Sequence, residues 1–359
     1  MTYPTKVHID INALKHNFKR VRELAPKSKI MVMVKANAYG HGITEVAQAL
    51  CDADAFGVAC VEEASVIRQI GLDNPIVLMS GFIDPNNLTE ITKLNCEIVV
   101  HNIAQVEALE QINLSKPIKV WLKINTGMHR LGFAPKDVAG VHARLSNCKN
   151  VVAPPNLMTH FADANDTKKI TTSKQIKIFN ETTKNLSGEK SLANSAAILS
   201  FPESHADWVR PGGLLYGVSP LLNDEGAKHN LIAVMTLRSK IIAIQQAKKG
   251  AAIGYGGVWQ CPEDMSYAIV AIGYGDGYPR YAKSGTPVLV NGQVCALIGR
   301  VAMDMIAIDL RSHPQAKIGD EVILWGKGLP AEHVAEHADT ITYELFCRVV
   351  RRAQRKKED

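Results

Sequence analysis

Short apolar runs alternate with longer amphipathic segments through the first 225 residues, and this rhythm constrains the fold more than any other feature. Residues 30–34 are expected to form a fully buried strand and residues 43–50 a helix. Strands separated by helices indicate parallel pairing, and about eight such pairs favour a (β/α)8 barrel of the TIM type. A doubly wound sheet is the alternative, but no Gly-x-Gly-x-x-Gly string follows the first strand. Further strands are expected at 55–60, 75–79, 98–101, 119–124 and 156–160, and further helices at 103–110, 137–145 and 173–186.

The rhythm changes at residues 220–228, a polar and turn-rich stretch that is expected to be a linker. Closely spaced strand patterns follow, and the Asn291-Gly292 pair between two of them is a strong hairpin signal. The sequence therefore predicts a barrel domain over residues 1–225 and a C-terminal, predominantly β domain over residues 226–359. The strands of the second domain are expected at 231–244, 267–272, 287–290, 293–298, 305–310 and 321–325.

The composition is that of an ordinary globular protein. With 46% hydrophobic and 21% charged residues among 359, the chain is not dominated by disorder. Its seven cysteines are scattered without a Cys-x-x-Cys pair, which favours reduced thiols in a cytosol over a disulfide framework or a zinc site. No apolar signal core opens the chain, and no run is long enough to cross a membrane. We therefore expect a soluble, cytoplasmic protein without a membrane partner.

The net charge of +6 is concentrated in a basic run between Arg348 and Lys357. A nucleic-acid patch is one interpretation of such a run. A solvated tail is the other, and it is favoured because no interleaved aromatic residues or binding motif accompany the charges. We expect no nucleic-acid partner.

Lys35 is the first candidate for chemistry because it ends the first expected strand. Side chains at the carboxyl ends of barrel strands face the active-site mouth. A buried lysine loses solvation of its charged form, so its pKa falls and its amine becomes nucleophilic. A lysine that snorkels from a strand end is the commoner alternative for an isolated residue. The surrounding residues therefore decide between the two interpretations.

Seven strings, in the same order along nearly the whole chain, resemble those of the alanine racemase family, pyridoxal-phosphate enzymes with a barrel and a β domain. Each string is weakly diagnostic alone, whereas the ordered set is highly specific. The strings are VKANAYGHG (34–42), KINTGMHRLG (123–132), NSA (194–196), VRPGGLLYG (209–217), IGYGG (253–257), GYGDGYPR (273–280) and GRVAMD (299–304).

This resemblance implies interconversion of L- and D-alanine by two bases, one on each face of the substrate. Pyridoxal phosphate delocalises the charge left at the α-carbon, which makes the α-proton accessible. Lys35 would carry the cofactor and serve as the base on the face of the D-enantiomer's proton, and Tyr255 would serve the other face. In the family the tyrosine reaches the lysine of the other subunit, so the resemblance implies a homodimer with shared active sites. Taken alone, Tyr255 could simply pack in a glycine-flanked turn.

The resemblance also implies that two residues form hydrogen bonds leading to the phenol of Tyr255. A phenol has a pKa of about 10, so a nearby cation must lower it before it acts as a base at neutral pH. His160 and Arg210 would form the hydrogen-bonded chain that does so. Arg210 would also face the pyridine nitrogen, where an arginine weakens the electron sink and suppresses transamination. An ion pair is the alternative role for this arginine.

Four residues match the contacts that the family makes with the cofactor's phosphate: Tyr39, Ser195, Gly212 and Gly213. Glycine lets the backbone approach an anion closely. For Ser195 a helix N-cap is an alternative or additional role. Each of these residues lies in one of the seven matching strings, so the phosphate contacts are expected in the barrel domain.

Three further residues match substrate contacts. Arg130 would bind the substrate carboxylate and the cofactor's phenolic oxygen, and the backbone of Met303 from the partner chain would hold the same carboxylate. Tyr274 would narrow the entrance to fit a methyl group, or it is a surface tyrosine in a turn. Lys123 matches a lysine that some members carbamylate to fix the arginine. A plain charged neighbour is an equally open interpretation of Lys123.

The chain departs from the family's pattern at three places. Asn125 stands where aspartate is commoner, and Ala302 replaces a frequent cysteine. The segment 343–352 lacks, at about the position of Arg351, the tyrosine that adds a phosphate contact in some members, and we assign no role to Arg351. These departures leave the two expected bases in place.

Three other functions fit parts of the pattern. Barrel-type decarboxylases of basic amino acids share the layout, but they oppose the pyridine nitrogen with glutamate and use a cysteine across the dimer, so Arg210 and Ala302 argue against them. A racemase of broader specificity usually carries a secretion signal, and no such signal is recognised in this sequence. A non-catalytic cofactor-binding barrel would lack residues 230–359 and Tyr255. The expected function is therefore an alanine racemase that supplies D-alanine for peptidoglycan.

Overall fold

Eight parallel strands close into a barrel in this computed structural model, which describes residues 4–349 and 354–358. The last of them, β9 (Trp208–Arg210), pairs with β2 (Lys29–Met33) and closes the ring, so the predicted (β/α)8 barrel is confirmed. Between these two, each strand pairs in parallel with the next: β3 (Ala55–Val58), β4 (Ile76–Leu78), β5 (Cys96–Val100), β6 (Val120–Lys123), β7 (Asn156–Met158) and β8 (Lys190–Asn194).

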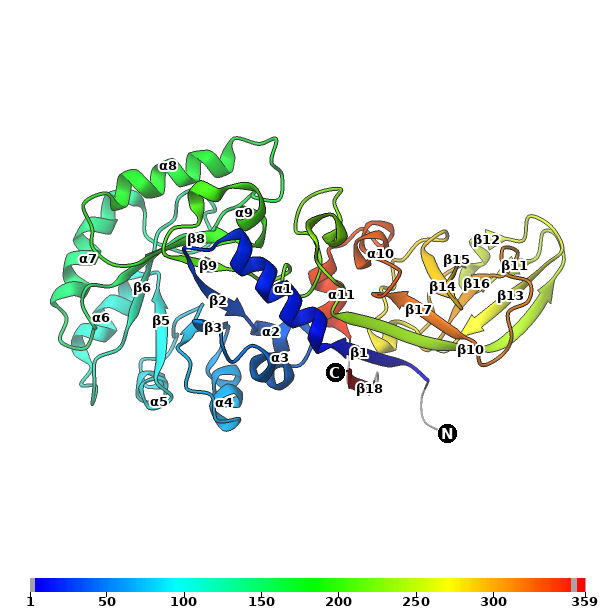
Figure 1. Cartoon of the computed structure of the whole chain (residues 1–359), viewed down its shortest axis with the longest axis horizontal. Coiled ribbons are helices and arrows are strands. Elements are labelled where there is room, and N and C mark those ends of the chain that lie inside the picture. Colours follow the sequence, from blue (N-terminus) through cyan, green and yellow to red (C-terminus); the bar gives the residue numbers. More distant parts are fainter. Residues whose placement is uncertain (1–3, 350–353, 359) are drawn as a thin grey trace.

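Helices between the strands cover the outside of the barrel (Figure 1). In α6 (Ile103–Gln111), for example, Val106 and Leu109 are buried, and Asn102 caps the first turn by accepting from the amide of Gln105. The sequence patterns did not predict β8 or the helices at 11–24, 35–39, 87–93 and 195–200. The other helices are α1 (Ile11–Leu24), α2 (Lys35–Tyr39), α3 (Ile43–Ala49), α4 (Val61–Gln69), α5 (Asn87–Lys93), α7 (Val138–Asn147), α8 (Thr171–Thr183) and α9 (Ser195–Ser200).

The C-terminal part is built on a mostly antiparallel sheet, with two short helices beside it, α10 (Ala331–His337) and α11 (Thr342–Arg348). The Asn291-Gly292 hairpin is confirmed, and both of its turn residues have positive φ. A separate small hairpin joins β11 (Ala252–Ile253) to β12 (Trp259–Gln260). The strands of the main sheet in this part are β10 (Met235–Ala247), β13 (Met265–Val270), β14 (Pro287–Val290), β15 (Gln293–Ile298), β16 (Ile306–Asp309) and β17 (Glu321–Trp325).

The two ends of the chain meet in this second sheet. β1 (Lys6–Asp10) pairs with β10, although residues 1–225 were assigned to the barrel domain. Its side chains alternate between buried and half-buried, which is typical of a sheet with one covered face rather than of a barrel strand. β18 (Gln354–Glu358) pairs in parallel with β1, so this part of the basic C-terminal run forms a strand. The division at residue 225 stays a prediction.

Two tryptophans fill the amino end of the barrel. The Trp121 ring is fully buried and lies edge-on to Trp208, with 5.8 Å between the ring centroids. Each indole N–H donates to a carboxylate, from Trp121 to Glu97 at 2.7 Å and from Trp208 to Glu189 at 2.8 Å. Because buried indoles need a partner for that N–H, the two glutamates fix the orientation of the rings.

Replacing Trp121 with alanine is expected to lower the free energy of unfolding by about 3–5 kcal/mol, since it leaves a large cavity and deprives Glu97 of a donor. Trp121→Phe keeps most of the volume and is expected to cost about 1–3 kcal/mol, chiefly through the lost hydrogen bond. Urea unfolding of the three proteins measures both changes. Equal stability of Trp121→Ala and the wild type would show that Trp121 does not stabilise the amino end of the barrel.

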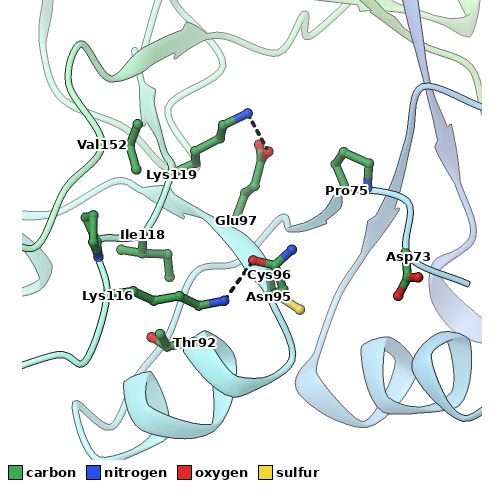
Figure 2. Close-up of a pocket in the computed structure, with 11 residues that line it drawn as sticks. Asp73, Pro75, Thr92, Asn95, Cys96, Glu97, Lys116, Ile118, Lys119 and Val152 are labelled. Atoms are coloured by element: carbon green, nitrogen blue, oxygen red, sulfur yellow. Dashed lines mark hydrogen bonds and ion pairs between the residues drawn. The ribbon is translucent and has the colours of Figure 1, made fainter.

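A pocket also opens at this amino end of the barrel (Figure 2). It is lined by Cys96 and Glu97 at the start of β5 and by residues before β4 and β6. Its lysines are already paired within the chain, Lys116 with the Asn95 side chain at 3.1 Å and Lys119 with Glu97 at 3.6 Å. Because its lining residues stand at or before the starts of strands, the pocket lies at the opposite end of the barrel from Lys35, which follows the end of β2.

No helix among residues 4–349 has the length and apolar character needed to cross a bilayer.

Candidate active site

The carboxyl ends of the barrel strands bring together most of the residues predicted for the site. Lys35 follows β2, Lys123 ends β6, His160 follows β7, Ser195 follows β8 and Arg210 ends β9. The carboxyl ends of parallel strands form one rim of a barrel, where the loops of such folds build active sites. The structure therefore places these five residues around one mouth.

The charges at this mouth are mostly positive. Burial lowers the pKa of Lys35, and the neighbouring guanidinium groups of Arg130 and Arg210 lower it further. Burial and the same two arginines, with Lys35, lower the pKa of Lys123 to about 7. Glu63 is a carboxylate that acts on Lys35 in the opposite direction. A cluster of this kind favours the neutral, nucleophilic form of the Lys35 amine and attracts anionic groups.

Arg210 is almost completely buried, with 3% of its surface exposed. Its guanidinium donates to Ser191 Oγ at 2.5 Å and to the carbonyl oxygen of Thr159 at 2.7 Å. A third contact joins it to His160 Nδ1 at 3.4 Å. None of its partners in the described part of the chain is a carboxylate, so the ion-pair interpretation of Arg210 is not confirmed. Burial lowers its pKa to about 10.

His160 lies beside this arginine. Its pKa is held well below the ordinary value by burial and then by Arg210 and Lys123. The ring is therefore neutral at pH 7 and has one nitrogen that accepts and one that donates a hydrogen bond. The buried Gln175 on α8 fixes the backbone here, because its amide donates to the His160 carbonyl at 3.1 Å.

Arg130 lies on a loop that leaves β6 and returns to it. The amide of Phe133 donates to the carbonyl of Lys123 at 2.9 Å, which closes the loop. Asn125, where the family more often has aspartate, accepts from the amides of Gly127 at 3.2 Å and His129 at 3.0 Å. An amide oxygen therefore organises the loop, and Arg130 stays close enough to lower the pKa of Lys35.

A cradle of hydroxyl groups and glycine backbone lies beside the mouth. Ser195 Oγ accepts from the amide of Gly212 at 2.8 Å. A Cβ atom on Gly212 would lie 2.8 Å from the Tyr39 hydroxyl, so a side chain at this position would displace that hydroxyl. The alternative role of Ser195 as a helix N-cap is not supported, because Asn194 caps α9 by accepting from the Ala197 amide.

Tyr343 completes the cradle and was missed by the sequence analysis. Its hydroxyl is hydrogen-bonded to the Ser195 side chain and to the Gly213 backbone. A Cβ atom on Gly213 would lie 2.5 Å from that hydroxyl, and the Tyr343 ring lies 5.5 Å from the ring of Tyr39. The expectation that segment 343–352 offers no tyrosine to this region is therefore wrong. Arg351 lies outside the described residues.

The connection from Lys35 to the cradle has an unusual backbone. Ala36, Asn37, Ala38 and Tyr39 all have φ near 53°, so the short element α2 contains a left-handed turn without glycine. Left-handed conformation costs roughly 1–2 kcal/mol for each such residue, so the surrounding structure must hold this turn. The turn joins the lysine at its start to the Tyr39 phenol of the cradle.

Three predicted residues do not lie in this mouth within one chain. Tyr255 sits in the connection of the β11–β12 hairpin, at the end of the molecule far from the barrel (Figure 1). Tyr274 and Met303 lie in neighbouring loops, and the amide of Gly275 donates to the Met303 carbonyl at 2.8 Å. The three side chains are 67%, 41% and 54% exposed, respectively. The single chain therefore presents these residues on its surface.

Known proteins of one family match this chain over nearly its whole length. The family models for the N-terminal and C-terminal domains of alanine racemase match residues 9–220 and 234–357. The alanine racemases of Coxiella burnetii (strain Dugway 5J108-111) and Nitrosococcus oceani are each 50% identical to this chain, over 96% and 100% of both sequences.

Solved structures agree with these sequence matches. The biosynthetic alanine racemase from Pseudomonas aeruginosa is 40% identical and superposes with a TM-score of 0.97 over 100% of both chains. The alanine racemase from Acinetobacter baumannii is 39% identical, with a TM-score of 0.94 over 99% of this chain and 100% of that one. The chain therefore belongs to the alanine racemase family, and its reaction is the interconversion of L- and D-alanine.

Proposed function

We propose that this racemase works with pyridoxal phosphate, held by the cradle and Lys35. The observation that carries the proposal is a partly buried amine with a lowered pKa beside a cradle in which a side chain at either glycine would displace a tyrosine hydroxyl. Tyr39, Ser195, Tyr343 and the amides of the two glycines supply hydrogen-bond donors of the kind a phosphate needs. The surrounding lysines and arginines supply the matching charge.

Each residue of the mouth then has a distinct task. The cofactor supplies an electron sink that makes the α-proton of alanine removable. Lys35 would hold that group covalently and move the proton on the face of the D-enantiomer. Arg130 would bind the substrate carboxylate, and Arg210 would donate to the pyridine nitrogen. Because Arg210 has no carboxylate partner among the described residues, its guanidinium is free of a competing charge at that point.

The opposite face is served by Tyr255 of a second subunit in this proposal. The support is geometric: Tyr255, Tyr274 and Met303 are exposed in one protomer, while the residues they would join lie in the barrel mouth. The neutral His160 and the adjacent Arg210 would stabilise the phenolate form of that Tyr255 in the barrel mouth. Met303 would hold the substrate carboxylate through its backbone, and Tyr274 would limit the space for the side chain. A homodimer with two shared sites follows.

Lys123 is proposed to be carbamylated. Its pKa of about 7 means that its amine is protonated below that pH and neutral above it, and only the neutral amine reacts with carbon dioxide. The modified fraction is therefore expected to rise as the pH increases from about 6 to about 8. Intact-mass measurement of wild type and Lys123→Ala under bicarbonate checks this. If Lys123 is unmodified at every pH, the carbamylation proposal is wrong, and Lys123 is a plain neighbour of Arg130.

The proposal for the cofactor is tested with purified protein and pyridoxal phosphate. We expect an absorption band of lysine-linked cofactor and optical inversion of L-alanine. The band without inversion or exchange of the α-proton would favour the non-catalytic barrel. Loss of the carboxyl group from basic amino acids would favour a decarboxylase, and efficient inversion of large or basic amino acids would favour the broader racemase.

A biosynthetic role in the cytoplasm is proposed for the D-alanine that the enzyme makes. Its support is the resemblance to the Pseudomonas aeruginosa enzyme, which is described as a biosynthetic alanine racemase. Deletion of the gene is expected to make growth depend on added D-alanine, with peptidoglycan as the consumer. Growth of the deletion strain without D-alanine, in the absence of a second racemase gene, would contradict this role. Cell fractionation tests the location.

A further inference from the structure

We infer that Glu63 is a positioning residue of this active site, whose carboxylate holds the left-handed turn between Lys35 and Tyr39. The inference rests on the proposed roles of those two residues in binding pyridoxal phosphate. Glu63 lies on α4 and does not belong to the cradle itself. Its effect on the cofactor would therefore pass through the backbone of the turn.

The turn is held by hydrogen bonds at several points. Within it, the amide of Ala38 donates to the Val34 carbonyl at 2.7 Å, and that of Gly40 donates to the Ala36 carbonyl at 3.0 Å. The amide of Asn37 points outward and donates to Glu63 Oε1 at 3.4 Å. Asn37 lies between Ala36 and Ala38, which bear the steric cost of left-handed backbone, so this contact fastens the turn between two residues whose sequence preference opposes it.

Glu63 connects the turn to the barrel. Its second carboxylate oxygen accepts from the amide of Ala59 at 2.8 Å, directly after β3. β3 pairs with β2, the strand that leads into Lys35. On the other side, the Asn37 side chain accepts from the amide of Ile43 at 2.9 Å, where α3 begins. The turn is therefore fastened at one side to the neighbouring strand end and at the other to the following helix.

This arrangement controls where the two functional side chains lie. Lys35 immediately precedes the left-handed residues, and Tyr39 is the last of them. Any relaxation of Ala36–Ala38 towards ordinary backbone angles would change the direction of both side chains. The Tyr39 hydroxyl would then leave its place against Gly212 in the cradle. Loss of Glu63 should therefore weaken cofactor binding without removing a group that touches the cofactor.

Glu63 also carries a charge that acts on Lys35, so the two effects need to be separated. Arg130, Arg210 and Cys347 are the other groups that act on the lysine electrostatically. A purely electrostatic role would not respond to relief of backbone strain. A positioning role would, because glycine adopts positive φ without the steric cost that alanine has. Ala36 suits this purpose, since its side chain is exposed and its φ is 53°.

The test uses four variants of the full-length protein: Glu63→Ala, Ala36→Gly, the double variant and Glu62→Ala. Glu62 is the neighbouring exposed carboxylate on α4 and serves as the matched control. Titration with pyridoxal phosphate gives the affinity of each protein. Hydrogen exchange of the cofactor-free proteins reports on the peptide that covers residues 34–43.

We expect Glu63→Ala to weaken cofactor affinity about fivefold and to speed exchange in the 34–43 peptide, while Glu62→Ala matches the wild type. Adding Ala36→Gly should recover most of the lost affinity. The inference is overturned if Glu63→Ala leaves both measurements unchanged, or if glycine at position 36 restores nothing. Failure of the wild type to bind the cofactor would refute the proposed function instead, whereas the exchange comparison would still test Glu63.

Discussion

Lys35→Ala is expected to lower kcat/KM for alanine racemisation by about 10⁴-fold or more, because it removes both the covalent anchor and one of the two bases. The absorption band of lysine-linked cofactor should disappear as well. Burial and two neighbouring arginines lower the pKa of this lysine, which shifts the wild-type amine towards the neutral form that the anchor and the base require. Optical rotation and absorbance of the same samples measure both effects.

Lys93→Ala is the matched control for this change, since Lys93 is exposed on α5, outside the proposed site. It should retain the band and the wild-type rate. A Lys35→Ala protein that still inverts alanine at a rate near that of the wild type would show that another residue carries the cofactor. Lys123 would then be the first alternative, because it is the other buried lysine of the mouth.

Tyr255→Phe is expected to lower racemisation by about 10³-fold while the absorption band of lysine-linked cofactor remains. The substitution removes a single hydroxyl from an exposed side chain, so the fold and the cradle are unaffected. In heavy water, D-alanine should still exchange its α-proton on the Lys35 face, whereas L-alanine should not. Proton NMR follows this exchange directly.

Tyr267→Phe provides the control for Tyr255→Phe, because Tyr267 lies on β13 of the same domain and packs in a small apolar cluster. It should behave as the wild type in both assays. If Tyr255→Phe instead abolished the band, the division of roles between the lysine and the phenol would be wrong. Unchanged racemisation would remove Tyr255 from the mechanism.

The barrel and most of the mouth could be predicted from the sequence because their signals are local. A buried parallel strand is a short apolar run, and the residue that follows it lies at the mouth by the geometry of the fold. Lys35, Lys123, His160 and Arg210 all stand at or directly after such strands. The strings that resemble the family predicted a role for each of these four residues. The geometry of the parallel strands explains why the four side chains lie at the same mouth.

Other features depend on contacts between distant segments, which no local pattern reports. Tyr343 reaches the cradle because α11 packs on the loop after Lys35, where a Cβ on Gly40 would meet the Phe346 carbonyl at 2.1 Å. β1 joins the second sheet through a pairing more than 200 residues away in the sequence. The left-handed turn was also missed, since Ala36 and Ala38 favour right-handed helix when considered alone.

In the proposed dimer each active site combines Lys35 of one subunit with Tyr255 of the other, and mixed dimers distinguish this arrangement from a site within one subunit. Lys35→Ala and Tyr255→Phe proteins are unfolded together in equal amounts and refolded, alongside each protein refolded alone. Half of the dimers should be hybrids with one intact site, so about a quarter of the wild-type activity should return. If the mixture remains as inactive as its two components, the bases do not come from different subunits, and the account is contradicted.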